Sequence, residues 1–166
     1  MTIYLVIPLL VIVAVLQSAV VSHLTVRGVF ADLPLLIVTS WALLRGPREG
    51  VIWGFIAGVS VDLLSGAPFG AATLSLMAVG FLAGLSKGGV FHAHFLSPAL
   101  VMFLATMLYS LIFLTIVWAS GSLVSWLPSL VSMVLPSAPL NALLAPVVFV
   151  LVRLLQKRFS FEEMEW

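Results

Sequence analysis

Apolar residues dominate the chain in long runs, and short polar interruptions divide these runs. Period-2 alternation, which is typical of a membrane β-barrel, is absent. The first and fifth runs are long enough to cross a bilayer, because about 20 residues span the hydrocarbon. The pattern predicts an all-α protein of about six transmembrane helices in one polytopic domain over residues 1–166. The expected helices cover about 3–26, 31–45, 49–64, 70–87, 95–120 and 138–157.

The composition supports an integral membrane protein. The chain is 63% hydrophobic and 8% charged, with a mean hydropathy of +1.28, whereas a soluble domain carries about 25% charged residues. Cysteine is absent, which excludes a disulfide framework and thiol chemistry. The net charge is +1, and no basic cluster precedes the C-terminal tail, so no nucleic-acid partner is expected. The lipid bilayer is the expected environment.

The basic residues predict the orientation through the positive-inside rule. With six helices and a cytoplasmic N-terminus, only Arg27 lies on the outer side. The C-terminus is then cytoplasmic as well, and no five-helix arrangement sorts the basic residues so cleanly. The residues expected on the cytoplasmic side are Arg45, Arg48, Lys87, Arg153, Lys157 and Arg158.

The second and third predicted helices are short, and a re-entrant hairpin is an alternative at this length. The turn between them reads "RGPREG" and contains Arg45, Gly46, Arg48 and Glu49. Charges left at the bilayer centre would each cost about 3 kcal/mol on insertion scales. We therefore expect these charges to reach water or headgroups, in a spanning hairpin whose ends neighbouring helices cover.

The long connection before the last helix is rich in apolar residues and serine. Ser122, Ser125, Ser129 and Ser132 recur at helical spacing. This spacing predicts an amphipathic helix over about 122–134 in the outer interface. A plain hydrophobic loop is the alternative, and the sequence does not decide between the two.

Glycines at a spacing of four residues mark one face of the third predicted helix. Residues four apart lie on nearly the same side of a helix, so Gly50, Gly54 and Gly58 form a smooth groove. Gly80 and Gly84 begin a similar stripe on the fourth helix. Such stripes allow two helix backbones to approach closely. We expect these two helices to pack on each other, or each to receive a different helix or a partner.

Asp62 continues the glycine series. An intramembrane carboxylate is typically a functional group or a polar anchor. The alternative is a helix-end aspartate that reaches the outer headgroups, with Ser65 and Gly66 in the turn. The sequence leaves both interpretations open. Asp32 precedes the second helix, where it can cap the helix or pair with Arg27, and the cap is favoured.

No catalytic set is present in the sequence. Neither a His-Glu-x-x-His motif nor a phosphate-binding loop occurs. His92 and His94 have no Cys, Asp or Glu nearby to complete a metal site, and a solvated pair is favoured. Asn141, with two prolines around it, gives the last helix a polar position for which packing is the favoured role. No enzyme activity, metal or cofactor is expected.

The region from residue 32 to residue 84 resembles the MreD family of rod shape-determining proteins. The likeness lies in an aspartate opening helix two, an Arg-Gly-x-x-Glu-Gly turn, a glycine-rich helix three and an Asp-Leu-Leu-Ser-Gly-x-Pro-x-Gly exit. Ala31 departs from the family, since many members have proline there. The matching residues are Asp32, Arg45, Gly46, Glu49, Gly50, Gly54, Gly58, Asp62, Leu63, Leu64, Ser65, Gly66, Pro68 and Gly70, followed by "GFLAG" at 80–84.

The resemblance implies a non-enzymatic scaffold in the bacterial inner membrane. Such a protein would bind the membrane span and juxtamembrane region of MreC. It would help couple MreB filaments to peptidoglycan synthesis by RodA and its penicillin-binding transpeptidase. The resemblance also implies the six-helix fold of the substrate-binding subunits of energy-coupling-factor transporters. The alternative function is therefore a small-molecule-binding membrane subunit of a vitamin-type transporter, with an outward pocket near Asp62 and Asn141.

Overall fold

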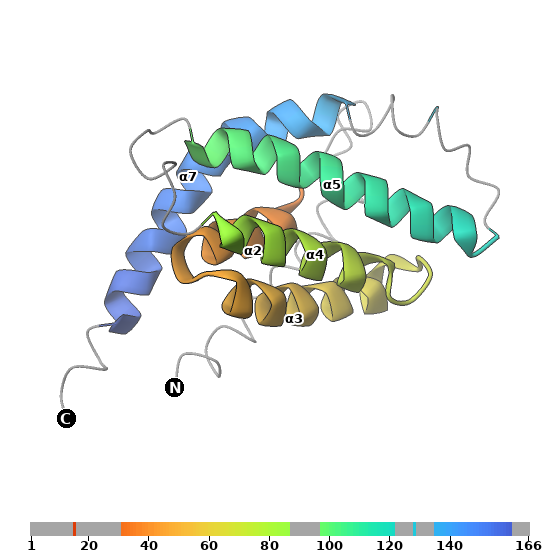
Figure 1. Cartoon of the computed structure of the whole chain (residues 1–166), viewed down its shortest axis with the longest axis horizontal. Helices are drawn as coiled ribbons and strands as arrows, with labels where there is room; N and C mark the ends of the chain where they lie inside the picture. Colours follow the sequence, from red (N-terminus) through yellow and green to blue (C-terminus); the bar gives the residue numbers. More distant parts are fainter. Residues whose placement is uncertain (1–14, 16–30, 87–96, 122–127, 129–134, 161–166) are drawn as a thin grey trace.

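The computed structural model describes residues 31–86, 97–121 and 135–160, together with Val15 and Pro128. All regular structure in the three ranges is α-helical (Figure 1). The expected helix at 3–26 and the expected interfacial helix at 122–134 lie outside the described residues, apart from Val15 and Pro128. The helices, in chain order, are α2 (Leu33–Arg45), α3 (Pro47–Ser65), α4 (Ala71–Leu85), α5 (Ser97–Ala119) and α7 (Leu135–Ser160).

The helix ends follow local signals in the sequence. Asp32 caps α2, and Pro34 occupies the first turn of that helix, where its missing N–H costs nothing. Gly66 ends α3 in the left-handed conformation, with φ 63°. The start of α7 departs from the expected position, because the helix already begins at Leu135 and contains Pro139 within its second turn.

Helix α2 is the centre of the described bundle. It packs against α3, α4, α5 and α7, and nine of its 13 residues are buried. All five helices contribute to one apolar core around it. The buried members of that core are Leu35, Leu36, Val38, Trp41, Trp53, Ala57, Leu76, Val79, Met102, Ala105, Ala145 and Val152.

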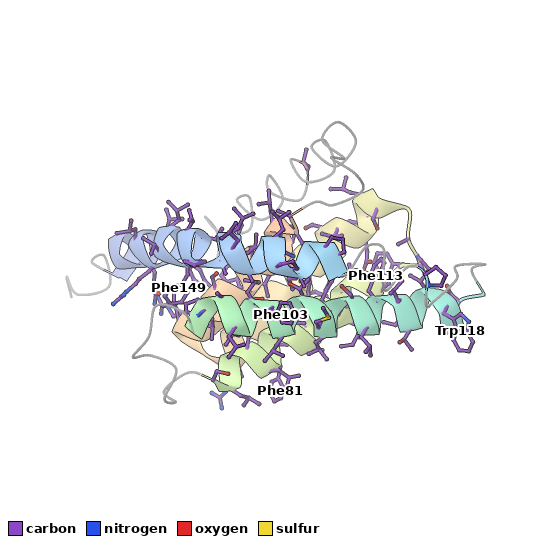
Figure 2. The ribbon with its side chains drawn as sticks, turned by 90° about the horizontal axis from the view of Figure 1, so that it is seen from above. Phe81, Phe103, Phe113, Trp118 and Phe149 are labelled. Atoms are coloured by element: carbon purple, nitrogen blue, oxygen red, sulfur yellow. The ribbon has the colours of Figure 1, made fainter. Side chains whose placement is uncertain are left out.

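The outside of the bundle is apolar as well. Phe81 on α4 and Phe103 and Trp118 on α5 point away from the core (Figure 2), and all three are exposed. Within the described residues, Pro98–Ala119 and Pro136–Gln156 are long and apolar enough to cross a membrane. Only 22% of an 18-residue stretch of each segment is buried in the protein, unlike the core helix of a soluble protein.

Hydroxyl groups on the helices bond mostly to their own backbone. Ser75 and Thr106 are buried, and each donates to the carbonyl four residues earlier, at 2.7 and 2.8 Å. Ser60 and Thr115 make the same bond. This local bonding satisfies a hydroxyl in surroundings that offer no water. These serines and threonines are therefore compatible with an apolar environment.

Candidate functional site: the α3–α4 face and its aspartate

The glycine face of α3 lies against α4 (Figure 1), and this is the most extensive helix pair in the described bundle. Gly58 meets the backbone of Thr73, and Gly54 meets the backbone of Leu76 and Met77. One helical turn further along, Gly50 contacts Gly80, and beyond that pair Gly84 contacts Pro47. Each step of three or four residues along α3 is matched by a step of three or four in the opposite direction along α4. The two helices are therefore antiparallel and in register along the whole face.

The approach is too close for side chains. A Cβ atom on Gly50 would lie under 3.0 Å from the carbonyl of Gly80, and the reciprocal Cβ on Gly80 would meet the carbonyl of Gly50. Gly54, Gly58 and Gly84 would likewise meet backbone atoms under 3.0 Å away. Backbone atoms cannot rotate aside as a side chain can, so substitution must push the helices apart. The expected close packing of these two helices is thus what fills the glycine face.

Asp62 follows Gly58 on the same face of α3 and lies beside the beginning of α4. Its Oδ2 accepts hydrogen bonds from the backbone N–H groups of Gly70 and Thr73, both at 3.0 Å, and from the Thr73 hydroxyl. Its Oδ1 accepts from the backbone N–H of Ala72 at 2.9 Å. The side chain is 4% exposed. Asp62 therefore caps α4 from the neighbouring helix, because the cap residue of α4 itself is Gly70 and has no side chain.

This position explains why a carboxylate follows the glycines. At Gly50, Gly54 and Gly58, α3 faces the continuous backbone of α4, where a hydrogen atom is the only side chain that fits. Asp62 instead lies beside the beginning of α4, and the first N–H groups of α4 have no partner within that helix. A carboxylate fits there because it accepts several hydrogen bonds and because negative charge is stabilised at a helix N-terminus. The interpretation of Asp62 as a headgroup-facing residue is wrong, since its side chain is buried.

The turn between α3 and α4 is fixed by two left-handed glycines. Gly66 has φ 63° and Gly70 has φ 97°, conformations in which a Cβ is strained. Ser65 is the last residue of α3, and its hydroxyl accepts a hydrogen bond from the N–H of Ala67 at 3.4 Å. The N–H of Ala71 donates to the carbonyl of Pro68 at 3.1 Å. Ser65 and Gly66 thus belong to a tight turn, as the sequence predicts.

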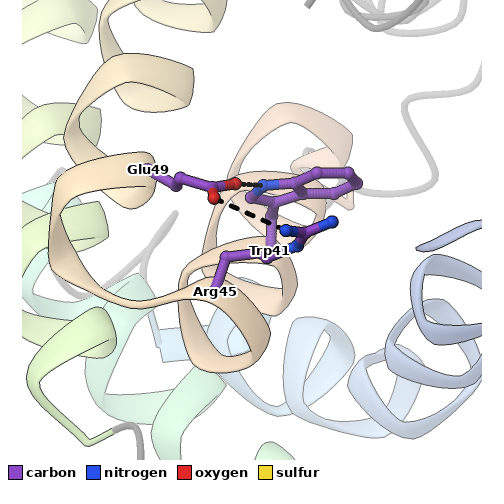
Figure 3. A network of polar contacts seen from close by, with 3 residues as sticks. All are labelled: Trp41, Arg45 and Glu49. Carbon is purple, nitrogen blue, oxygen red and sulfur yellow. Dashed lines mark hydrogen bonds and ion pairs between the residues drawn. The ribbon is translucent and has the colours of Figure 1, made fainter. Parts of the chain in front are cut away.

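The turn between α2 and α3 consists of one residue, Gly46, with φ 104°. Figure 3 shows how Glu49 closes this turn. One of its carboxylate oxygens accepts from the indole N–H of Trp41 at 2.8 Å, and the other lies 3.8 Å from the Arg45 guanidinium. Arg48 is exposed. The RGPREG motif is therefore a tight turn between two helices that contacts among Trp41, Glu49 and Arg45 stabilise.

A second polar connection joins α2 to α5 and α7. Asp32 caps α2 by accepting from the N–H of Leu35 at 3.2 Å, which confirms the favoured role. The N–H of Asp32 donates to the Asn141 side-chain oxygen at 3.1 Å, across 109 residues of sequence. The amide of Asn141 donates in turn to the Thr106 hydroxyl at 3.3 Å. Asn141 is completely buried, so it links three helices inside the bundle.

Three of these polar partners escaped the sequence reasoning. Trp41 and Thr106 look like ordinary core residues in the sequence, because the residues near them give no indication of their hydrogen-bond partners. Thr73 donates to Asp62, which lies 11 residues earlier, and no local spacing marks this pair. Asn141 is the single asparagine of the chain, which marks it as unusual without indicating Asp32 as its partner.

The main polar groups of the described bundle bond within the protein. Asp32, Asp62 and Asn141 all have hydrogen-bond partners within the chain. Among the described residues no group of three His, Cys, Asp or Glu side chains could hold a metal ion. His23, His92 and His94 lie outside the described residues.

Over the described residues, the chain is an all-helical bundle in which two helices are long and apolar enough to cross a membrane. The chain belongs to the MreD family: the model of rod shape-determining protein MreD matches residues 1–159 of 166. The family and the two apolar helices together indicate a membrane protein of the rod-shape determining system. The family is a structural component of that system and not a known enzyme family. No solved structure matches the chain significantly.

Proposed function

We propose that this chain is a non-enzymatic scaffold of the bacterial cell-wall elongation complex, embedded in the inner membrane by about six helices with both termini in the cytoplasm. In this role it binds the span and juxtamembrane region of MreC. It helps couple MreB to peptidoglycan synthesis by RodA and its penicillin-binding transpeptidase. The observation that carries the proposal is the family match over nearly the whole chain.

The use of the polar groups supports a scaffold rather than a catalyst. A general acid, a base or a ligand-binding group needs a polar atom directed at a substrate. Asp62 instead holds the first turn of α4, and Asn141 holds α2 and α5. These bonds make the bundle rigid, and rigidity is what a scaffold requires of its interior.

The glycine face has a different part in this proposal from the one its spacing alone suggests. Gly50, Gly54, Gly58, Gly80 and Gly84 are partner-interface candidates in the sequence, yet α4 and α3 fill that face themselves. The partner's span then meets the outer side chains of the bundle. Phe55 on α3, Phe103 on α5 and Val147 on α7 are exposed apolar positions on three different helices.

The alternative of a vitamin-type transporter subunit has no comparable support. It requires an outward polar pocket around Asp62 and Asn141. Both side chains are buried, at 4% and 0% exposed, and both already have partners.

Disulfide cross-linking in membranes tests the scaffold proposal, because the chain has no native cysteine. Single cysteines replace Phe55, Phe103 or Val147, and a second set of cysteines scans the span of MreC. We expect one of the three faces to cross-link with a helical period, and the other two to serve as matched controls. Gly54→Leu should abolish cross-linking together with correct folding. Efficient co-purification of MreC with Gly54→Leu, or no cross-link from any face, would count against the proposal.

A further inference from the structure

The four helices that contact α2 form an incomplete ring around it. Helix α3 packs on α4, α4 on α5 and α5 on α7, and each of the four also packs on α2. Helices α3 and α7 are the two ends of this series, and no extensive contact joins them. Among the described helices, α2 is therefore covered on the side of α4 and α5, and none lies over the side between α3 and α7.

One face of α2 points to this open side. Ala42 lies on the covered side, because it packs at Gly50, where α3 and α4 meet. The apolar residues of α2 that are only half-buried are Leu33, Ile37 and Leu44. Their positions, four and seven residues apart, place them on one side of the helix, opposite Ala42. Helix α2 thus presents a strip of large apolar side chains between α3 and α7.

The strip continues onto α3. Gly54 faces α4, and Trp53 contacts Trp41 of α2 with ring centroids 5.4 Å apart. At about 100° per residue, Trp53 lies about 100° from Gly54, and Ile56 lies about 60° further round in the same direction. Ile56 is therefore on the flank of α3 beyond α2, and it is half-buried against the core. The four residues of this open strip are Leu33, Ile37, Leu44 and Ile56.

The chain itself has a predicted helix close to the open strip. Residues 1–30 precede Ala31, which packs against the core. The sequence predicts a helix over about 3–26, and Val15 within it is helical. The connection, residues 27–31, spans at most about 18 Å, whereas packed helices lie about 8–10 Å apart. This tether holds the predicted helix beside the start of α2 at a high effective concentration, which the span of a separate protein lacks.

The predicted helix has a face suited to such a contact. Ala14, Ser18 and Ser22 follow at steps of four residues and share one face, whereas Leu16 and Val20 lie on the opposite face. Small residues let a neighbouring helix approach closely in a bilayer, where van der Waals packing drives association. On the open side such a helix would contact α2, α3 and α7 together, which is more than it could contact on the outside of the bundle.

We propose that residues 3–26 run antiparallel to α2 between α3 and α7, with Ala14, Ser18 and Ser22 against the open strip. The ring around α2 is then closed by the chain itself. The inference rests on the membrane insertion proposed above. It adds that the span of MreC is excluded from α2 and meets only the outside of the ring.

Disulfide formation within the full chain in membranes tests this packing, since the chain has no native cysteine. Ser40 is the anchor, because it lies between Ile37 and Leu44 on the same face of α2 and a change to cysteine barely alters its volume. Ser40→Cys is combined in turn with a cysteine on either face of the predicted helix. The second cysteines are Ala14→Cys, Ser18→Cys and Ser22→Cys on the proposed face, and Leu16→Cys and Val20→Cys as matched controls.

The extent of oxidation is counted by adding polyethylene-glycol maleimide after denaturation, since each remaining thiol shifts the band on a gel. Ser65→Cys with Ala67→Cys, in the exposed turn after α3, is the positive control, because these two residues already contact each other. We expect one cysteine of the proposed face to react with Ser40→Cys at least about fivefold faster than either control, because a disulfide requires Cβ atoms within about 4.5 Å.

A second anchor tests the direction of the predicted helix. When Ile37→Cys replaces Ser40→Cys, the best partner should move by about one helical turn toward residue 26, as an antiparallel register requires. Equal rates on the two faces, a best partner that does not move, or no disulfide while the positive control forms would each overturn the inference. Disulfide-linked dimers would show that a second copy covers α2, which overturns it as well. Release of the chain from membranes by alkaline carbonate would instead refute the proposed membrane insertion itself.

Discussion

Removal of the Asp62 carboxylate is the most informative perturbation of the α3–α4 face. The carboxylate accepts three backbone N–H bonds and one hydroxyl bond at a buried site. Loss of an ordinary N-cap costs about 0.5–2 kcal/mol. Each buried donor left without a partner adds about 1–3 kcal/mol, although such terms do not simply sum. We expect Asp62→Ala to lower the free energy of unfolding by about 3–4 kcal/mol.

Two further variants separate the cap from simple loss of volume. Asp62→Asn keeps the shape and one carbonyl oxygen but directs an amide N–H₂ at a backbone donor, so we expect about half the loss. In a double-mutant cycle, Asp62→Ala and Thr73→Val should be coupled by about 1 kcal/mol, because they remove the same bond. Ser65→Ala, in the exposed turn, is the matched control and should change stability by less than about 0.5 kcal/mol.

The assay is reversible unfolding in mixed micelles titrated with dodecyl sulfate, followed by far-ultraviolet circular dichroism. The comparison uses the free energy extrapolated to zero denaturant. A loss below about 0.5 kcal/mol for Asp62→Ala, or an additive cycle with Thr73→Val, would refute the role of Asp62 as the cap of α4.

Two other predictions use the same unfolding assay. Gly50→Ala gains about 1 kcal/mol of helix propensity but places a Cβ against the Gly80 carbonyl, an overpacking that costs about 1–3 kcal/mol or more. We therefore expect Gly50→Ala to lower the free energy of unfolding, whereas the control Ser60→Ala on the same helix should leave it nearly unchanged. A Gly50→Ala protein more stable than the wild type would contradict the packing argument. Asn141→Leu removes the links to Asp32 and Thr106 and should cost about 1–3 kcal/mol, and addition of Thr106→Val should then cost less than it does in the wild-type chain; full additivity would show that the amide does not join these helices.

Hydropathy and glycine spacing predict much of this bundle because both reflect properties that residues carry locally. The runs around Trp53 and Met102 are apolar wherever they pack, so their helices can be found without knowing their neighbours. The last helix begins at Leu135, three residues before the expected start at 138, and Pro139 lies inside it, since one missing N–H near a helix start does not end a helix.

The role of Asp62 could not be settled in the same way. Its donors are backbone N–H groups at the start of the following helix, and every residue except proline carries such a group. Sequence letters therefore do not reveal it. The bond between Asp32 and Asn141 spans 109 residues and has no local pattern at all. The glycine stripe indicates close approach by some helix, while the antiparallel register fixes which helix it is.

The short central helix has a consequence for biogenesis. Helix α2 has 13 residues, or about 20 Å, against about 30 Å of hydrocarbon, so it is a poor span when it leaves the translocon alone. The described helices that cover its sides are all made afterwards, and the bond between the Asp32 N–H and Asn141 forms after α7 has been synthesised. Chains truncated before α7 therefore lack the partner of the α2 N-terminus. The contacts of α2 within the bundle are therefore complete only after α7 has been translated.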